Sequence, residues 1–219
     1  MGAFVAVVDY GRGNLRSVAK AFETVGIRVR VTQSPREIQD AAALVVPGQG
    51  AFDDCMRTLK ALELLDAIEE AVRSGKFYLG ICIGLQILYS ESEEHGVHAG
   101  LGYIPGRVVR FSETRRDVNG HRLKVPHMGW NRVSQAKGDL PLWRDIPDGS
   151  FFYFVHSYYG IPEREEDVAG WTDYGVSFAS AVYRENLFAV QFHPEKSQKM
   201  GLALLKNFGL WVGKEVFAK

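Results

Sequence analysis

The chain has 219 residues, 46% of them hydrophobic and 24% charged, a composition typical of a soluble globular protein. Its 26 basic residues balance 26 acidic ones, so it lacks the charge excess expected of a nucleic-acid-binding protein. No apolar run approaches the roughly 18 residues that cross a bilayer, and the N-terminus does not resemble a signal peptide. Two cysteines, Cys55 and Cys82, are too few for a disulfide framework. We therefore expect a cytoplasmic protein with no membrane or nucleic-acid partner.

The first ninety residues alternate between short apolar runs and helical patterns. The apolar runs predict strands at 3–8, 27–32, 41–46 and 77–81. Apolar residues at helical spacing predict a helix over 15–25, closed by Gly26, and a long helix over 53–74, closed by Gly75. Unbroken apolar strands that alternate with helices are typical of a parallel sheet covered on both faces.

After about residue 100 the pattern changes to short strands separated by turns. Strands are predicted at 108–111, 122–125, 151–155, 168–172, 177–183 and 187–192, and a last helix at 198–212. This half predicts antiparallel additions to the sheet. With no repeat and no linker, we expect residues 1–219 to form one α/β domain, a mainly parallel twisted sheet flanked by helices.

Gly80-Ile81-Cys82-Ile83-Gly84 is the sharpest local signal for chemistry. Small residues two before and two after a nucleophile permit a tight turn from strand to helix. Such a turn exposes the thiol near a helix N-terminus, which favours the thiolate, and directs the next backbone N–H toward an oxyanion. A buried structural cysteine between glycines is the alternative. Cys55, which lies inside a helical pattern, is expected to be a core residue.

A thiolate nucleophile needs a base, and the base needs an orienting group. Of the six histidines, His193 follows a predicted strand and precedes Pro194-Glu195, so Glu195 is placed to accept a hydrogen bond from its imidazole. His156 is the second candidate. Nothing in the sequence alone places either histidine beside Cys82.

Two other kinds of site are excluded. Gly11-Arg12-Gly13 follows a strand, but Arg16 stands where a dinucleotide-binding fingerprint needs a third small residue. No pair of histidines has metal-ligand spacing, and there is no CxxC, so we expect no metal.

Pro47-Gly48-Gln49-Gly50 ends a predicted parallel strand, where ligand sites of open α/β sheets gather, although an ordinary turn is the alternative there.

Taken together, these motifs resemble the class I, or triad, glutamine amidotransferases, whose fold is flavodoxin-like. The resemblance rests on Pro47-Gly48-Gln49-Gly50, Gly80-Ile81-Cys82-Ile83-Gly84-Leu85-Gln86 and His193-Pro194-Glu195. Other blocks narrow it to the glutaminase subunits of imidazole glycerol phosphate synthase and extend it over nearly the whole chain. These blocks are Asp9-Tyr10-Gly11-Arg12-Gly13-Asn14-Leu15, Pro126-His127-Met128-Gly129-Trp130-Asn131, Tyr153-Phe154-Val155-His156-Ser157-Tyr158 and Gln191-Phe192-His193-Pro194-Glu195-Lys196-Ser197.

The resemblance implies a mechanism and a set of roles. Cys82 attacks the side-chain amide of glutamine, His193 protonates the leaving ammonia and then activates water, and Glu195 orients His193. The backbone amides of Gln49 and Ile83 form the oxyanion hole, and no cofactor or metal takes part. The residues that line the glutamine pocket are Gly50, Gln86, Ser157 and Tyr158. This family more often has a small apolar residue such as valine at position 49, but only the backbone N–H of that residue serves the oxyanion hole.

The resemblance also implies a partner. Ammonia passes to a (β/α)8-barrel cyclase, which makes imidazole glycerol phosphate and an aminoimidazole carboxamide ribonucleotide in histidine biosynthesis. The family holds its glutaminase in check until that partner binds its ligand, and we expect the Gly48–Gln49 peptide to be the switch, because two glycines allow it to turn. The residues expected at the heterodimer interface are Asn14, Met128, Trp130 and Lys196.

Several alternatives stay open at this point. The same triad serves the glutaminase of pyridoxal phosphate synthase, which the block from Pro126 to Asn131 argues against, and paralogues in sugar modification, which the sequence does not exclude. A non-catalytic interaction protein on the same fold is disfavoured by the intact Cys82, His193 and Glu195. A thiol hydrolase of peptides is a third option.

Overall fold

The computed structural model describes residues 2–116 and 119–218. Its helices are α1 (Leu15–Thr24), α2 (Pro35–Asp40), α3 (Phe52–Ala61), α4 (Leu64–Arg73), α5 (Ile83–Gln86) and α6 (Gln198–Val212). Short 3-10 turns lie at Pro141–Trp143, Glu165–Asp167, Pro194–Lys196 and Lys214–Val216. No helix in this part of the chain is both long and apolar enough to cross a membrane.

A nine-stranded sheet forms the centre of the described molecule, in the order β2-β1-β3-β4-β13-β12-β11-β8-β9. The strands β2, β1, β3, β4 and β13 are parallel, and the remaining four add to them in antiparallel pairs. Their bounds are β1 Val5–Val8, β2 Val29–Thr32, β3 Ala43–Gly48, β4 Phe77–Cys82, β8 His127–Gln135, β9 Ser150–His156, β11 Val168–Asp173, β12 Ser177–Arg184 and β13 Leu187–Val190. The predicted fold, a mainly parallel sheet with antiparallel additions in the C-terminal half, is confirmed.

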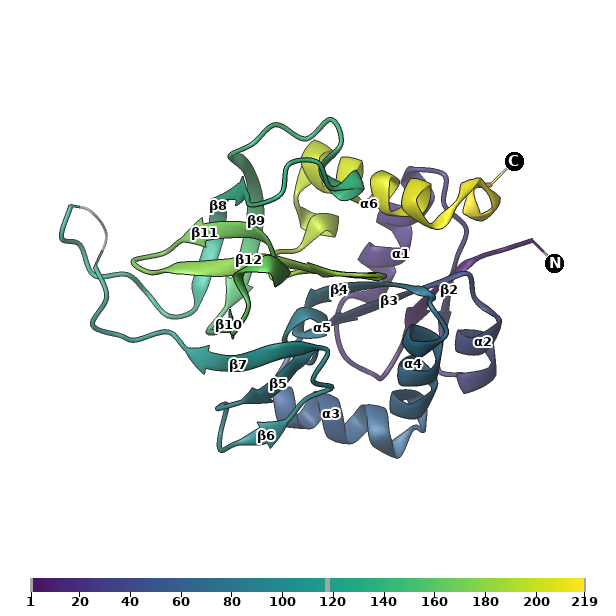
Figure 1. Ribbon diagram of the computed structural model, residues 1–219, viewed down its shortest axis with the longest axis horizontal. Coiled ribbons are helices and arrows are strands. Elements are labelled where there is room, and N and C mark those ends of the chain that lie inside the picture. Colours follow the sequence, from purple (N-terminus) through teal and green to yellow (C-terminus); the bar gives the residue numbers. More distant parts are fainter. Residues whose placement is uncertain (1, 117–118, 219) are drawn as a thin grey trace.

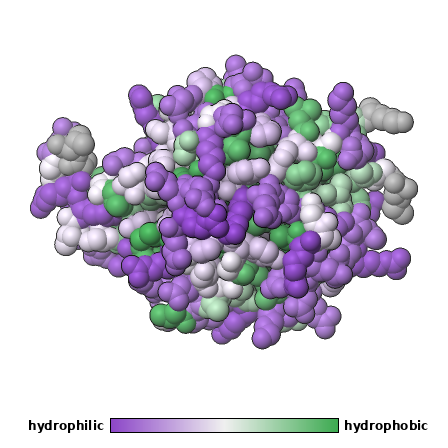
Figure 2. Space-filling view, viewed as in Figure 1, coloured by the Kyte–Doolittle hydropathy of each residue, from purple (hydrophilic) through white to green (hydrophobic). Residues whose placement is uncertain are grey.

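Helices cover both faces of the parallel strands (Figure 1). Side chains of α1 and α6 pack with Val5 and Val7 of β1 in one apolar core, whereas α2, α3, α4 and α5 pack with Ala6 and Val8 in the other. Alternate residues of one strand thus enter opposite cores, which explains why these strands read as unbroken apolar runs. The face of the molecule in this view is mostly hydrophilic, with hydrophobic residues in small scattered groups (Figure 2).

A second sheet of four strands, in the order β10-β7-β5-β6, was not predicted. It consists of β5 (Tyr89–Ser92), β6 (His98–Ala99), β7 (Ile104–Arg110) and β10 (Tyr158–Pro162). Because β10 follows β9 after the single residue Ser157, the chain passes directly from the edge of the main sheet into this smaller one. This crossing forms one wall of the pocket described below.

The helix predicted over 53–74 is wrong, since the structure has two helices there. Glu63 takes a left-handed conformation with φ of 57° between α3 and α4. A non-glycine residue in that conformation leaves no glycine or proline signal in the sequence. The break lets α4 pack against α2 while α3 contacts α5.

The strand predicted at 122–125 is also wrong. Arg122 forms only an isolated bridge with Arg116, in the long excursion between β7 and β8 at the left of Figure 1. No other strand pairing of this segment occurs within the described residues. An apolar alternation without a partner strand leaves its backbone groups unpaired and does not make a strand. The strand predicted at 187–192 ends earlier, at Val190.

Candidate active site

Cys82 stands on the sharp turn that the glycine pattern predicts. It is the last residue of β4, α5 begins at the next residue, and its φ is 57°. Such a conformation costs a non-glycine residue about 1–3 kcal/mol and persists only where the surroundings impose it. A Cβ at Gly84 would lie 1.8 Å from the Val46 carbonyl oxygen, and one at Gly80 would lie 2.4 Å from that of Gly84. Only glycine fits at these two positions.

The other thiol has a different environment. Cys55 lies in α3 with 2% of its surface exposed, in the core, as predicted. Burial raises the pKa of the Cys55 thiol to about 12, so it stays protonated at neutral pH. Cys82 borders a pocket, whereas Cys55 does not line it.

Three adjacent parallel strands bring the predicted motifs together. In the register of β3 and β4, Gly48 is directly opposite Cys82, so the Gly48–Gln49 turn leaves β3 beside the nucleophile. On the other side of β4, Val190 of β13 is opposite Ile81, and the segment that carries His193 follows. The carboxyl ends of parallel strands meet at one edge of a sheet, where ligands bind in open α/β folds.

His193 and Glu195 form a buried pair. Nδ1 of His193 lies 2.8 Å from Oε1 of Glu195, and their side chains are 3% and 2% exposed. Burial acts to lower the pKa of His193, but its interactions with Cys82 and with Glu195 outweigh burial and raise that pKa to about 10. The other ring nitrogen, Nε2, is buried and is the one left to interact with Cys82, because Nδ1 is held by Glu195, so it is the atom available for proton transfer.

In His156, the second candidate for the base, both ring nitrogens have hydrogen-bond partners. Its Nδ1 lies 2.8 Å from the carbonyl oxygen of Tyr158, and its Nε2 lies 3.0 Å from Nδ1 of His127. Burial lowers the pKa of His156 to about 3 and that of His127 to about 4. Both imidazoles are therefore neutral at pH 7, and the geometry favours His193 as the base.

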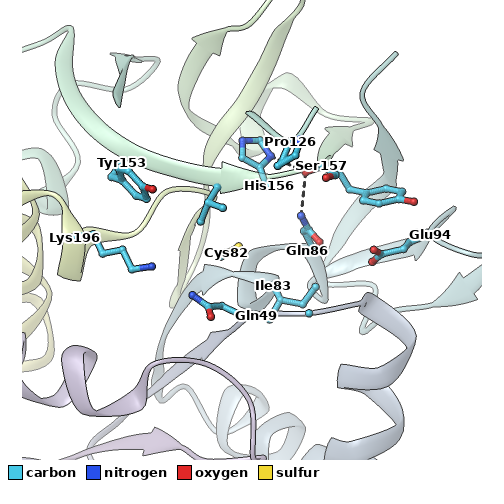
Figure 3. Close-up of a pocket in the computed structure, with 13 residues that line it drawn as sticks. Gln49, Cys82, Ile83, Gln86, Glu94, Pro126, Tyr153, His156, Ser157 and Lys196 are labelled. Atoms are coloured by element: carbon cyan, nitrogen blue, oxygen red, sulfur yellow. Dashed lines mark hydrogen bonds between the residues drawn. The ribbon is translucent and has the colours of Figure 1, made fainter. Parts of the chain in front are cut away.

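A pocket of about 420 Å³ opens over Cys82. Its lining includes all the residues predicted for the oxyanion hole and for glutamine, namely Gln49, Ile83, Gly50, Gln86, Ser157 and Tyr158. Gln49 and Ile83 lie on one side of the pocket and His156 and Pro126 on the other, with Lys196 and Glu94 at opposite ends (Figure 3). Among residues 2–116 and 119–218, no three His, Cys, Asp or Glu side chains could hold a metal ion.

Sequence reasoning did not assign several residues of this wall a role in the pocket. Glu94, Pro126, Tyr153 and Val155 line it. Tyr153 also positions the base, because its carbonyl accepts a hydrogen bond from the His193 backbone N–H, at 2.9 Å. Tyr153 and Val155 come from β9, far from Cys82 in sequence, and only the arrangement of the strands brings them to the pocket.

Of the residues predicted for the partner interface, three are exposed and Lys196 is half-buried. Met128 and Trp130 are exposed on β8, by 62% and 45%, and the Trp130 ring lies 6.1 Å from that of Tyr153. Nζ of Lys196 lies 5.8 Å from the same tyrosine ring. Asn14 is exposed and also caps α1, since its side-chain oxygen accepts from the backbone N–H of Ser17.

Comparison with known proteins agrees with this geometry. Residues 6–211 match the family model described as glutamine amidotransferase class-I. The chain belongs to the class-I glutamine amidotransferases. Within this family it is 52% identical to the imidazole glycerol phosphate synthase subunit HisH of Syntrophotalea carbinolica, over 94% of this chain and 98% of the relative. The subunit HisH of Aromatoleum aromaticum is 54% identical, over 94% and 98% of the two chains.

Solved structures support the fold. The structure titled PurLQS from Thermotoga maritima superposes with a TM-score of 0.70 at 18% identity, over 95% of this chain and 98% of that one. A structure titled glutamine amidotransferase gives a TM-score of 0.70 at 18% identity, over 94% and 100%. At this identity the likeness shows the class-I amidotransferase fold alone. Because its relatives are HisH subunits, this amidotransferase is an enzyme subunit of histidine biosynthesis.

Proposed function

We propose that this amidotransferase hydrolyses glutamine to glutamate and passes the ammonia to a (β/α)8-barrel cyclase, as the glutaminase half of an imidazole glycerol phosphate synthase. The observation that carries the proposal is the order of the neighbouring strands β3, β4 and β13. The Gly48–Gln49 turn, the Cys82 thiol and the segment with the buried His193–Glu195 pair follow the carboxyl ends of these strands. The identity of about 50% to HisH subunits supports the choice of acceptor. The whole chain would act as one domain, in the cytoplasm.

The first half of the reaction forms a thioester. The Cys82 thiolate attacks the side-chain carbonyl carbon of glutamine, and the electron pair of the C=O bond moves to oxygen. The backbone N–H groups of Ile83 and Gln49 would stabilise that oxyanion, because both residues border the pocket beside Cys82. As the C–N bond breaks, the proton on Nε2 of His193 passes to the leaving nitrogen, and ammonia departs.

The second half restores the enzyme. His193, now neutral, takes a proton from water, and the hydroxide oxygen attacks the thioester carbon. The C–S bond breaks, glutamate leaves, and the thiolate and imidazolium form again. Glu195 keeps Nδ1 of His193 protonated and the ring oriented, so Nε2 faces the reaction in both halves.

The partner would sit on the surface formed by Met128, Trp130 and Lys196, with Asn14 near its border. Lys196 connects this surface to the active site, because it also lines the pocket. Free ammonia is mostly protonated in neutral water and is then a poor nucleophile, so direct transfer into the barrel preserves its reactivity. The Gly48–Gln49 peptide remains our candidate for the switch that restrains hydrolysis until the partner is loaded.

The test is glutamate release from glutamine, by the purified chain alone and then with a barrel cyclase and its nucleotide ligand. We expect low activity alone and strong activation in the complex. Cys82→Ala should abolish glutamine-dependent synthesis while the complex still uses added ammonia. High activity without the partner would contradict the proposed regulation, and no activity in either state would contradict the glutaminase function.

A further inference from the structure

Gln191 is a fully buried glutamine for which the mechanism above has no use. It follows β13, has no exposed surface, and reaches the nucleophile: its Nε2 lies 3.6 Å from Sγ of Cys82. Its Oε1 lies 3.1 Å from Nε2 of Gln86, a residue of the pocket lining. The Gln191 amide therefore stands between the nucleophile and the pocket glutamine.

The orientation of this amide is fixed by a backbone carbonyl. Nε2 of Gln86 lies 3.1 Å from the oxygen of Tyr158 (Figure 3), and because that oxygen can only accept, Gln86 must turn its NH2 group toward it. The second N–H of the same group then meets Gln191, which must offer its oxygen. As a result, the NH2 group of Gln191 faces the sulfur, and Gln191 is a donor to Cys82.

The same carbonyl fixes the two buried histidines. His156 must carry its proton on Nδ1 to donate to Tyr158, so its Nε2 accepts from Nδ1–H of His127. Nε2 of His127 then accepts from Nδ2 of Asn131, at 3.3 Å. The Tyr158 carbonyl thus sets the direction of every hydrogen bond in both chains. No amide can flip and no imidazole can change its tautomer alone without the loss of a buried hydrogen bond.

A donor at this place has a chemical consequence for the thiol. A hydrogen bond from a neutral amide is stronger to a thiolate than to a thiol, so it favours the charged form. It also holds the sulfur on the side of β13, where His193 lies. We propose that Gln191 is a positioning residue for the nucleophile, which holds the Cys82 sulfur by an N–H···S hydrogen bond and favours its thiolate form. This inference rests on the proposed function only for the role of Cys82 in glutamine hydrolysis.

Two variants separate this role from that of a core glutamine. Gln191→Met has nearly the same length but no donor. Gln191→Glu keeps an oxygen for Gln86 and, in its ionised form, places an acceptor at the sulfur in place of the donor. Gln135→Met is the control, because Gln135, like Gln191, donates a hydrogen bond from its side-chain amide. Its acceptor is the Ile146 carbonyl, at 2.7 Å, and Gln135 does not line the pocket.

The primary readout is the rate at which iodoacetamide alkylates Cys82 as a function of pH, followed on the Cys82 peptide by mass spectrometry so that Cys55 does not contribute. It is measured on the full chain and does not require glutamine to be the substrate. We expect the midpoint of the profile to rise by about one pH unit in both Gln191 variants and to stay unchanged in Gln135→Met. In the complex with the cyclase, kcat for glutamine should fall roughly tenfold or more at pH 7 with little change in KM.

Alkylation profiles like that of the wild type in folded Gln191 variants would overturn the proposal. If neither variant folds, the wild type is compared with Cys82→Ala, in which Gln191 is unchanged. The side-chain amide NMR signals of Gln191 should shift when the sulfur is removed. Signals that stay in place would refute the hydrogen bond. A wild type that does not hydrolyse glutamine would instead refute the proposed function, since the alkylation profile is independent of it.

Discussion

The buried pair His127 and His156 should make the protein sensitive to acid, by an amount that follows from the structure. Burial is the main cause that lowers the pKa of both, to about 4 and about 3, from 6.5 in an unfolded chain. Charge acts in the same direction: Arg115 lowers both pKa values, and His127 and His193 lower that of His156. The hydrogen bond between the two rings leaves no room for a second proton, because Nδ1–H of His127 already occupies Nε2 of His156.

The sign follows from proton linkage. Above pH 6.5 both histidines are neutral in either state, so they add no pH dependence. As the pH falls below 6.5, both histidines become protonated in the unfolded chain but stay neutral in the folded protein. The free energy of unfolding therefore decreases until the pH reaches the pKa values of the folded state. Between pH 7 and pH 5 this amounts to about 2 kcal/mol for each histidine, or about 4 kcal/mol for the pair if they titrate independently.

Urea unfolding at pH 7 and pH 5 measures this loss, and the double variant His127→Gln, His156→Gln isolates it. Glutamine keeps a donor and an acceptor but does not titrate, so the variant should lose about 4 kcal/mol less than the wild type over this range. His193 titrates in both proteins and cancels in the difference. An equal loss in both proteins, or imidazole NMR signals of either histidine that titrate above pH 6, would refute the reasoning.

Three further predictions test the turn at Cys82, the interaction of Cys82 with His193, and the candidate partner surface. Gly84→Ala should destabilise the fold by more than 2 kcal/mol, since its Cβ would lie 1.8 Å from a backbone oxygen; a thermal melt like that of the wild type would show that the turn yields. Cys82→Ala should lower the pKa of His193 from about 10, because an interaction that raises it is removed while burial still lowers it; an unchanged imidazole titration by NMR would show that Glu195 alone sets it. Trp130→Ala, which removes a 45% exposed ring, should reduce activation by the cyclase more than it lowers the melting temperature, and a large loss of melting temperature would make the ring structural.

The parallel half of the fold could be predicted because burial on both faces leaves a direct trace in the sequence. The runs at 3–8, 41–46 and 77–81 contain β1 and most of β3 and β4, and the glycines around Cys82 predict the turn. The break at Glu63 left no trace, because its left-handed conformation is imposed by packing and not by residue type. The second sheet was missed for a related reason: short strands such as β6 are defined by their pairing partners.

The candidate site divides in the same way. Cys82, His193 and Glu195 belong to local motifs, so they could be named from the sequence. Gln191 could not, because its contact with Cys82 depends on the register of β13 against β4. His127 and His156 were visible in two motifs, but only the pairing of β8 with β9, in which they are directly opposite, shows that they share a hydrogen bond.

The two halves of the fold hold the catalytic pair in different ways. Cys82 is fixed within the parallel sheet, by glycines that tolerate no Cβ and by the Tyr78 hydroxyl, which donates to the Gly84 carbonyl at 2.7 Å. The segment of His193 is fixed from the antiparallel edge, where the Tyr153 carbonyl accepts from the His193 backbone N–H and the Tyr153 N–H donates to Oγ of Ser197. The ring of Tyr153 also lies beside Trp130 of β8 and Lys196, so β9, the strand that positions the base, packs directly against the candidate partner surface. A partner seated there would contact the strand that holds the His193 segment, whereas the turn of Cys82 is held inside the parallel sheet.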